Sequence, residues 1–153
     1  MEYKIIDKGP MQIMGISIRT TNENDQAVKD LPPVWDRFYS EQIPTKIPYQ
    51  KSGEVLGLYC EYEKDHTKPY TFVAGFDVTV AGEIPEGLVV KHLPESKYAV
   101  FEISGQFPQQ LIQTWQWIWQ SDLNRTFTGD FEAYQIGFDG EKNTDIHIYI
   151  AIN

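Results

Sequence analysis

The chain has 153 residues, enough for one domain with a sizeable core, and 13 basic against 22 acidic residues give it a net charge of −9. This acidity argues against nucleic-acid binding, because phosphate backbones attract basic surfaces. A single cysteine, Cys60, excludes an internal disulfide, and the three histidines are scattered, so we expect neither a metal site nor a cofactor. Without an apolar stretch near roughly 20 residues or a signal peptide, the sequence predicts a cytoplasmic protein with no membrane contact.

In the first half, alternating apolar residues bounded by glycine and proline predict four strands, at residues 3–7, 11–20, 55–62 and 70–80. Between the second and third strands lies an apolar stripe with helical spacing, formed by Leu31, Val34, Trp35 and Phe38. Pro32 and Pro33 interrupt the stripe, so we expect a helix only from about Pro33. We expect an irregular connection at 43–53, a solvated loop at 63–69, and a bulge or a close backbone approach at Gly75.

The second half repeats this order. Strands are predicted at residues 88–92, 98–103, 131–137 and 144–152. The clearest helix, at 106–121, has an apolar stripe of Phe107, Leu111, Trp115, Ile118 and Trp119. The order predicts an α+β fold built from a duplicated ββαββ unit, in a single domain covering residues 1–153. Its pseudo-symmetric halves, about 1–80 and 87–153, would each have an antiparallel sheet and one main helix.

Strand alternation gathers aromatic and acidic side chains on one set of faces. In the segment FEAYQIG, Glu132 and Tyr134 point to the same side. We expect the apolar strand faces to receive the helices, and the opposite faces to meet in a ligand cleft that displays Tyr59, Glu61, Glu132, Tyr134 and Tyr149. Aligning the halves matches Tyr59 with Tyr134 and Gly57 with Glu132, so one half offers an acid where the other offers space.

The candidate ligand-binding residues are Glu132, Tyr134, Tyr59, Tyr149, Trp115, Trp35 and Phe72. Each also has a structural interpretation. Glu132 either faces water or lines a cavity that receives a cation, since buried carboxylates are rarely unpaired. The tyrosines are pocket walls or ordinary cross-strand pairs, and the tryptophans are core residues or pocket lining. Gly75 leaves the direction of Phe72 open, and Cys60 is expected to be a small buried residue.

Several segments, in this order and spacing, resemble the GyrI-like (gyrase-inhibitor-like) effector-binding family: PVWDRFYSE, VLGLYCEYEKDHTKPYTFVAGFDV, QTWQWIW, FEAY and DIHIYIAI. The family also forms the ligand domain of AraC- and MerR-type regulators, and the likeness is greatest to its integron-cassette-type, single-domain branch. The resemblance implies the duplicated fold, with bulky cationic or aromatic compounds bound between the halves. It places the family's cation-contacting glutamate at Glu132. Ala151 stands where the family usually has proline, a departure that concerns the strand edge.

We therefore expect a stand-alone effector-binding protein for drug sensing or sequestration, since the sequence begins at the first predicted strand and shows no helix-turn-helix. No nucleophile–base pair or phosphate motif is apparent, which favours binding over catalysis. Two alternatives remain open. One is a hydrolase of reactive cyclopropane-type compounds, which the resemblance to some relatives implies. The other is a protein-interaction module whose partner is a regulator or a gyrase-like protein.

Overall fold

The computed structural model describes all residues from 1 to 153, and its eight strands form one antiparallel sheet in the order β1-β6-β8-β7-β3-β4-β2-β5. The strands are β1 (Lys4–Lys8), β2 (Met11–Thr20), β3 (Val55–Cys60), β4 (Tyr70–Asp77), β5 (Val89–Leu93), β6 (Ser96–Ile103), β7 (Asp130–Tyr134) and β8 (Ile146–Ile152). The helices are α1 (Gln26–Ser40), α2 (Ile43–Lys46) and α3 (Gln109–Gln120), with a 3-10 turn at Glu23–Asp25 before α1. The predicted α+β class is confirmed, and none of the helices has the length and apolar character that a membrane span requires.

The strand order contains the predicted duplication. Exchanging each strand of the first half for its counterpart in the second gives the same order in reverse, so a pseudo-twofold axis passes between β3 and β7. The halves also exchange their first strands: β1 pairs with β6, and β5 pairs with β2. This exchange joins the two predicted sheet halves into one continuous sheet.

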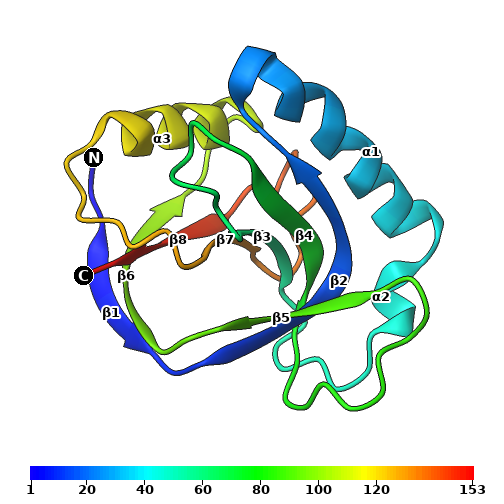
Figure 1. Ribbon diagram of the computed structural model, residues 1–153. Helices are drawn as coiled ribbons and strands as arrows, with labels where there is room; N and C mark the ends of the chain where they lie inside the picture. Colours follow the sequence, from blue (N-terminus) through cyan, green and yellow to red (C-terminus); the bar gives the residue numbers. More distant parts are fainter.

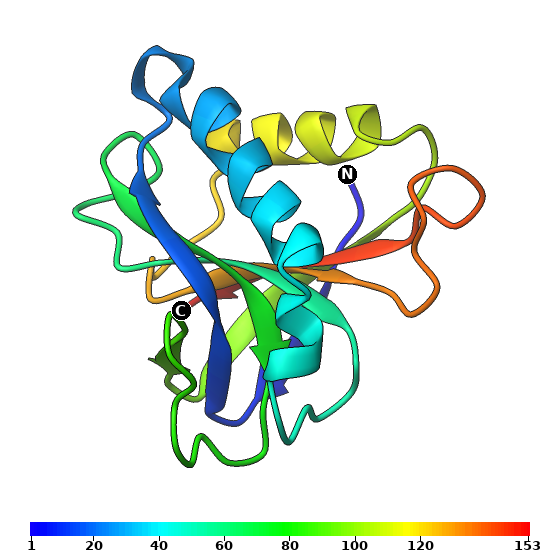
Figure 2. The same ribbon diagram turned by 90° about the vertical axis from the view of Figure 1, so that its right-hand side faces the viewer.

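The sheet curls strongly, and both long helices lie on its outer face (Figures 1 and 2). Its inner face closes on a core drawn from seven strands, which includes Met11, Leu58, Val73, Tyr98 and Phe131. On the outer face, α1 packs over a cluster that includes Phe38, Phe72 and Phe76, and α3 packs over Ile146, Ile148, Ile150 and Ile152. The alternation of β8 is therefore as expected, since its isoleucines all face α3.

The expectation that the helices would cover the faces opposite to Tyr59 and Glu132 is wrong. Both residues lie on the outer face, between the helices, whereas Leu56, Leu58 and Cys60 face the inner core. The physical reason is that both faces of the central strands are apolar enough to be buried, so alternation alone did not say which one the helices cover.

Local details of the first half differ in part from the prediction. Helix α1 runs without a break through Pro32 and Pro33, which are both exposed. Proline has no backbone N–H, so the carbonyl groups of residues 28 and 29 receive no helical hydrogen bond from them, and both of these residues are exposed to water. A short helix, α2, replaces part of the irregular connection at 43–53. The close backbone approach at Gly75 is confirmed: Gly75 pairs with Gly15, and a Cβ added at Gly75 would lie 2.1 Å from the Met14 carbonyl oxygen.

Candidate ligand-binding site

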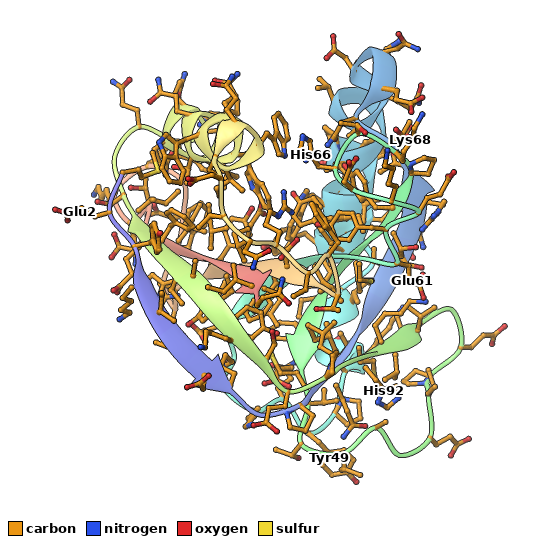
Figure 3. The ribbon with its side chains drawn as sticks, turned by 60° about the vertical axis from the view of Figure 1, so that its left-hand side comes forward. Glu2, Tyr49, Glu61, His66, Lys68 and His92 are labelled. Carbon is orange, nitrogen blue, oxygen red and sulfur yellow. The ribbon has the colours of Figure 1, made fainter.

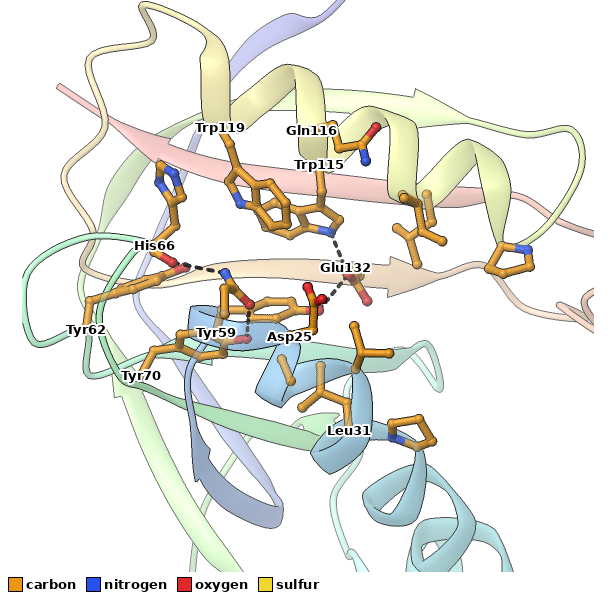
Figure 4. Close-up of a pocket in the computed structure, with 17 residues that line it drawn as sticks. Asp25, Leu31, Tyr59, Tyr62, His66, Tyr70, Trp115, Gln116, Trp119 and Glu132 are labelled. Atoms are coloured by element: carbon orange, nitrogen blue, oxygen red, sulfur yellow. Dashed lines mark hydrogen bonds between the residues drawn. The ribbon is translucent and has the colours of Figure 1, made fainter.

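A cavity of about 580 Å3 opens between α1 and α3, above the centre of the sheet (Figure 4). The first turns of α1 supply one wall through Ala27, Val28, Leu31 and Pro32, and α3 supplies the other through Leu111, Ile112, Trp115, Gln116 and Trp119. The sheet and its loops supply the floor and one end through Tyr59, Tyr62, His66, Tyr70 and Glu132. No lysine or arginine lines the cavity, so its formal charges, those of Asp25 and Glu132, are negative.

Glu132 is the buried acid of the cavity floor, with only 2% of its surface exposed. Its Oε2 atom accepts hydrogen bonds from the Tyr59 hydroxyl at 2.9 Å and from the Trp115 indole N–H at 2.7 Å. Its Oε1 atom accepts one from the Tyr134 hydroxyl at 2.7 Å. Three neutral donors therefore hold the carboxylate, and no cationic side chain of the protein forms an ion pair with it.

The position of Glu132 follows from the pseudo-symmetry. In the β3–β7 ladder Glu132 pairs directly with Gly57, so the axis passes through this pair. Tyr59 and Tyr134 are the symmetric counterparts on either side, and both donate to Glu132. A tryptophan ring backs each of them: Trp115 lies 5.0 Å from Tyr59, and Trp35 lies 5.5 Å from Tyr134. A glutamate in both halves would place two carboxylates at the axis, where they would repel each other. With Gly57 as the counterpart of Glu132, the axis holds a single carboxylate.

Gly57 supplies the room for this carboxylate. A Cβ added at Gly57 would lie 3.0 Å from Oε1 of Glu132 and 3.3 Å from the Phe72 ring. The predicted relation, an acid in one half facing empty space in the other, is thus visible as direct contact between β3 and β7.

A second buried acid, Asp130, lies two residues before Glu132 on the same strand and shows what a paired carboxylate looks like in this protein. Its Oδ2 atom is 2.8 Å from Nη2 of Arg125 and also accepts from the Tyr62 hydroxyl, while Oδ1 accepts from the backbone N–H of Ala151. Asp130 has its counter-cation within the fold, whereas Glu132 has only neutral donors.

The end of the cavity beside the β3–β4 loop is closed by stacked rings. His66 lies flat against Trp119, with ring centroids 5.7 Å apart and an interplanar angle of 9°. Figure 3 shows His66 between α1 and α3, far from His92 and Tyr49. Asn22 donates to the His66 carbonyl and accepts from the Tyr70 hydroxyl, which ties this loop to the segment before α1. The expectation that 63–69 is simply solvated is therefore wrong for His66, which is half-buried.

Burial sets the protonation preferences of the site. It raises the pKa of Glu132, while hydrogen bonds from Tyr134, Trp115 and Tyr59 oppose the rise by stabilising the carboxylate. Burial, and then the nearby charge of Glu132, raise the pKa values of Tyr59 and Tyr134 well above their usual range, so both remain donors. Burial, and then the charge of Arg125, lower the pKa of His66, which favours its neutral form.

Of the seven predicted site residues, Glu132, Tyr59 and Trp115 line the cavity. Three others, Tyr134, Trp35 and Phe72, do not line it. Tyr134 donates a hydrogen bond to Oε1 of Glu132, Trp35 packs against Tyr134, and Phe72 packs against Tyr59. Tyr149 was misplaced, because it lies on the inner face, stacked on Phe131 at 4.5 Å. Glu61 was misplaced too: it is exposed and pairs with Lys91.

Sequence reasoning missed several lining residues, chiefly Tyr62, Tyr70, His66, Leu111 and Val28. For Tyr70 a signal existed, since it shares a strand face with Phe72. For His66 and Val28 there was none, because a loop and a helix start lie beside the cavity only through long-range packing. Cys60 is buried as expected, and burial raises its pKa to about 12.

A family model described as an integron-associated effector binding protein matches residues 4–152. The chain belongs to this family. It is 30% identical over 143 residues to YobU of Bacillus subtilis, which bears the name of a transcriptional regulator; the match covers 90% of this chain and 89% of YobU. The resemblance to GyrI-like effector-binding proteins is thereby confirmed.

Solved structures share the fold of this integron-associated family member. An integron cassette protein from Vibrio cholerae superimposes with a TM-score of 0.77 at 26% identity, covering 99% of this chain and 95% of that protein. SAV2435 bound to tetraphenylphosphonium superimposes with a TM-score of 0.81 at 23% identity, covering 100% of this chain and 94% of that protein. The chain thus belongs to an effector-binding family, has a relative named as a transcriptional regulator, and shares its fold with a ligand-bound protein.

Proposed function

We propose that this protein binds bulky aromatic cations in the cavity between α1 and α3, with Glu132 as their counter-charge, in order to sense or sequester them. The observation that carries the proposal is a buried carboxylate on the floor of an aromatic cavity, held by three neutral donors and paired with no cation. A buried carboxylate without a counter-charge is costly, and a bound cation would offset that cost.

Asp130 supports this interpretation as an internal comparison. It is fully buried on the same strand, and the fold provides Arg125 as its cation. The fold can therefore place a guanidinium beside a buried acid, yet none lies beside Glu132. We therefore expect a cationic ligand to supply the positive charge at that site.

The cavity walls suit a flat or multi-ring cation. Tyr59, Tyr62, Tyr70, Trp115 and Trp119 all line it, and aromatic faces attract cations by about 0.5–2 kcal/mol each, most strongly where water is excluded. Trp119, 38% exposed, and the exposed Val28 and Ile112 leave apolar surface near the opening. The volume of about 580 Å3 is typical of small-molecule sites.

The net charge of −9 adds long-range attraction for cations. The family membership supports an effector role, and YobU is named as a transcriptional regulator, so we extend the proposal to the reporting of such compounds to transcription.

The test uses tryptophan fluorescence and thermal unfolding of the full chain. Tetraphenylphosphonium, the compound bound to SAV2435, serves as the first probe. A matched second pair is (2-naphthylmethyl)trimethylammonium and its uncharged carbon isostere, 2-neopentylnaphthalene. The cations are expected to quench fluorescence and raise the unfolding midpoint, and the charged member of the pair to bind more tightly.

Glu132→Gln is the decisive variant. This substitution keeps the size of the side chain and removes its charge. We expect it to lower the affinity for both cations by about 30-fold or more, and to change the affinity for the neutral isostere less than threefold. Equal losses for charged and neutral probes, or no binding of either cation by the wild type, would refute the proposal.

A further inference from the structure

The outer oxygen of Glu132 is saturated with hydrogen bonds from the cavity wall. A carboxylate oxygen has room for about two donors. Oε2 already accepts from the Tyr59 hydroxyl at 2.9 Å and from the Trp115 indole N–H at 2.7 Å, and both of these side chains line the cavity. A ligand approaching between α1 and α3 therefore meets the charge of Oε2 but no open acceptor position on it (Figure 4).

The hydrogen-bond partner of the other oxygen lies outside the cavity lining. Oε1 accepts from the Tyr134 hydroxyl, and Tyr134 does not line the cavity. On its strand side, Oε1 lies so close to Gly57 that an added Cβ would be 3.0 Å away. The remaining acceptor capacity of Glu132 thus faces the β3–β7 ladder.

Resting on the proposed function, we propose that Tyr59 and Trp115 make the cavity select permanently alkylated or arylated cations over protonated amines of the same charge. A protonated primary amine is a strongly hydrated group with three N–H donors, and it needs acceptors when it leaves water. A quaternary ammonium or a phosphonium has no N–H to satisfy. It gains the through-space attraction of Glu132 and the contact with ring faces without an acceptor.

The neutral oxygen atoms of the lining are weaker acceptors than a free carboxylate oxygen would be. The Asn22 side-chain oxygen already accepts from the Tyr70 hydroxyl, and the Tyr59 hydroxyl already donates to Glu132. Both are neutral, and hydrogen bonds to neutral oxygens are weaker than those to a carboxylate. Asp25, the second acid of the lining, is exposed and therefore remains in contact with water.

The pseudo-symmetry provides a matched pair of variants. Tyr59→Phe and Tyr134→Phe each remove one hydroxyl that donates to Glu132. Only Tyr59→Phe opens an acceptor position toward the cavity, because only Tyr59 lines it. Trp115→Phe removes the second donor to Oε2 and serves as an independent repeat of the same change.

The experiment compares (2-naphthylmethyl)ammonium with (2-naphthylmethyl)trimethylammonium, at a pH where both are fully charged. The wild type is expected to bind the quaternary probe about tenfold or more tightly, since an unsatisfied donor costs at least roughly that factor. The three methyl groups also add apolar contact, so the change in this ratio between variants decides the question. Tyr59→Phe and Trp115→Phe are expected to reduce the ratio about fivefold or more, and Tyr134→Phe to leave it within about twofold.

The outcomes separate this inference from the proposed function. If the quaternary probe binds and the ratio does not change in Tyr59→Phe or Trp115→Phe, the selectivity inference fails and cation binding stands. If Tyr59→Phe and Tyr134→Phe reduce the ratio equally, the effect is one of overall charge stabilisation, and the inference also fails. If the folded wild type binds neither these probes nor tetraphenylphosphonium, the proposed function itself is wrong. Unfolding midpoints of each variant confirm that the folded protein is being compared.

Discussion

Gly57→Ala tests whether the contact between the halves sets the position of the acid. The added Cβ would lie 3.0 Å from Oε1 of Glu132, which is 0.4 Å short of an ordinary 3.4 Å contact, and 3.3 Å from the Phe72 ring. Phe72 is packed against Trp35 and Tyr59, whereas Oε1 is held by a single hydrogen bond, so we expect the carboxylate to move. Moving Oε1 by about 0.4 Å away from Gly57 disturbs its 2.7 Å hydrogen bond from Tyr134 and displaces the charge from its native position.

Overpacking of this kind costs about 1–3 kcal/mol, and replacing glycine in a strand returns about 0.5–1 kcal/mol. We therefore expect Gly57→Ala to lower the free energy of unfolding by roughly 1–2 kcal/mol and to weaken (2-naphthylmethyl)trimethylammonium several-fold. Urea unfolding followed by tryptophan fluorescence gives the first quantity, and titration with the probe gives the second.

Gly9→Ala is the matched control, because a Cβ at Gly9 would have no atom within 4 Å. In a Glu132→Ala background the loss of stability caused by Gly57→Ala should largely disappear, since Oε1 of Glu132, the atom nearest the added Cβ, is absent. Wild-type stability and affinity in Gly57→Ala, or an unchanged cost in the Glu132→Ala background, would refute this account of the axis.

Three further outcomes follow from the geometry. Because folding raises the pKa of Glu132, protonation of this residue favours the folded state. The stability of the wild type relative to Glu132→Gln should therefore be greatest in acid and fall as the pH rises from about 4.5 through the folded pKa. Urea titrations across that pH range would measure this difference. Arg125→Met leaves the buried Asp130 without its counter-cation and should lower the free energy of unfolding by about 3–5 kcal/mol in the same assay. A change near zero would contradict this role of Arg125. Tyr149→Leu removes the ring that stacks on Phe131 at the inner face, so it should lower the free energy of unfolding by about 1 kcal/mol and leave the affinity for cations within twofold. A large loss of affinity would show that Tyr149 contributes to the binding site.

The order of elements could be predicted because each one carries a local signal. The isoleucines of β8 and the stripe of α3 indicate a strand and a helix through their period alone, and the repeat of that order indicates the duplication. The match of Gly57 with Glu132 followed from the repeat as well. The break expected at Pro32 was wrong, because tertiary packing of α1 over the sheet outweighed a local preference.

What the sequence by itself determined is that Glu132 and Tyr134 share a strand face and that an acid in one half faces a glycine in the other. Only the tertiary structure decided that this face lies beneath the helices and that Tyr149 lies on the other side. It also decided that Trp115 and Tyr59 hold Oε2, and that His66 closes the cavity. The physical reason is that alternation assigns side chains to two faces, whereas the choice between two apolar faces depends on contacts between segments far apart in the chain.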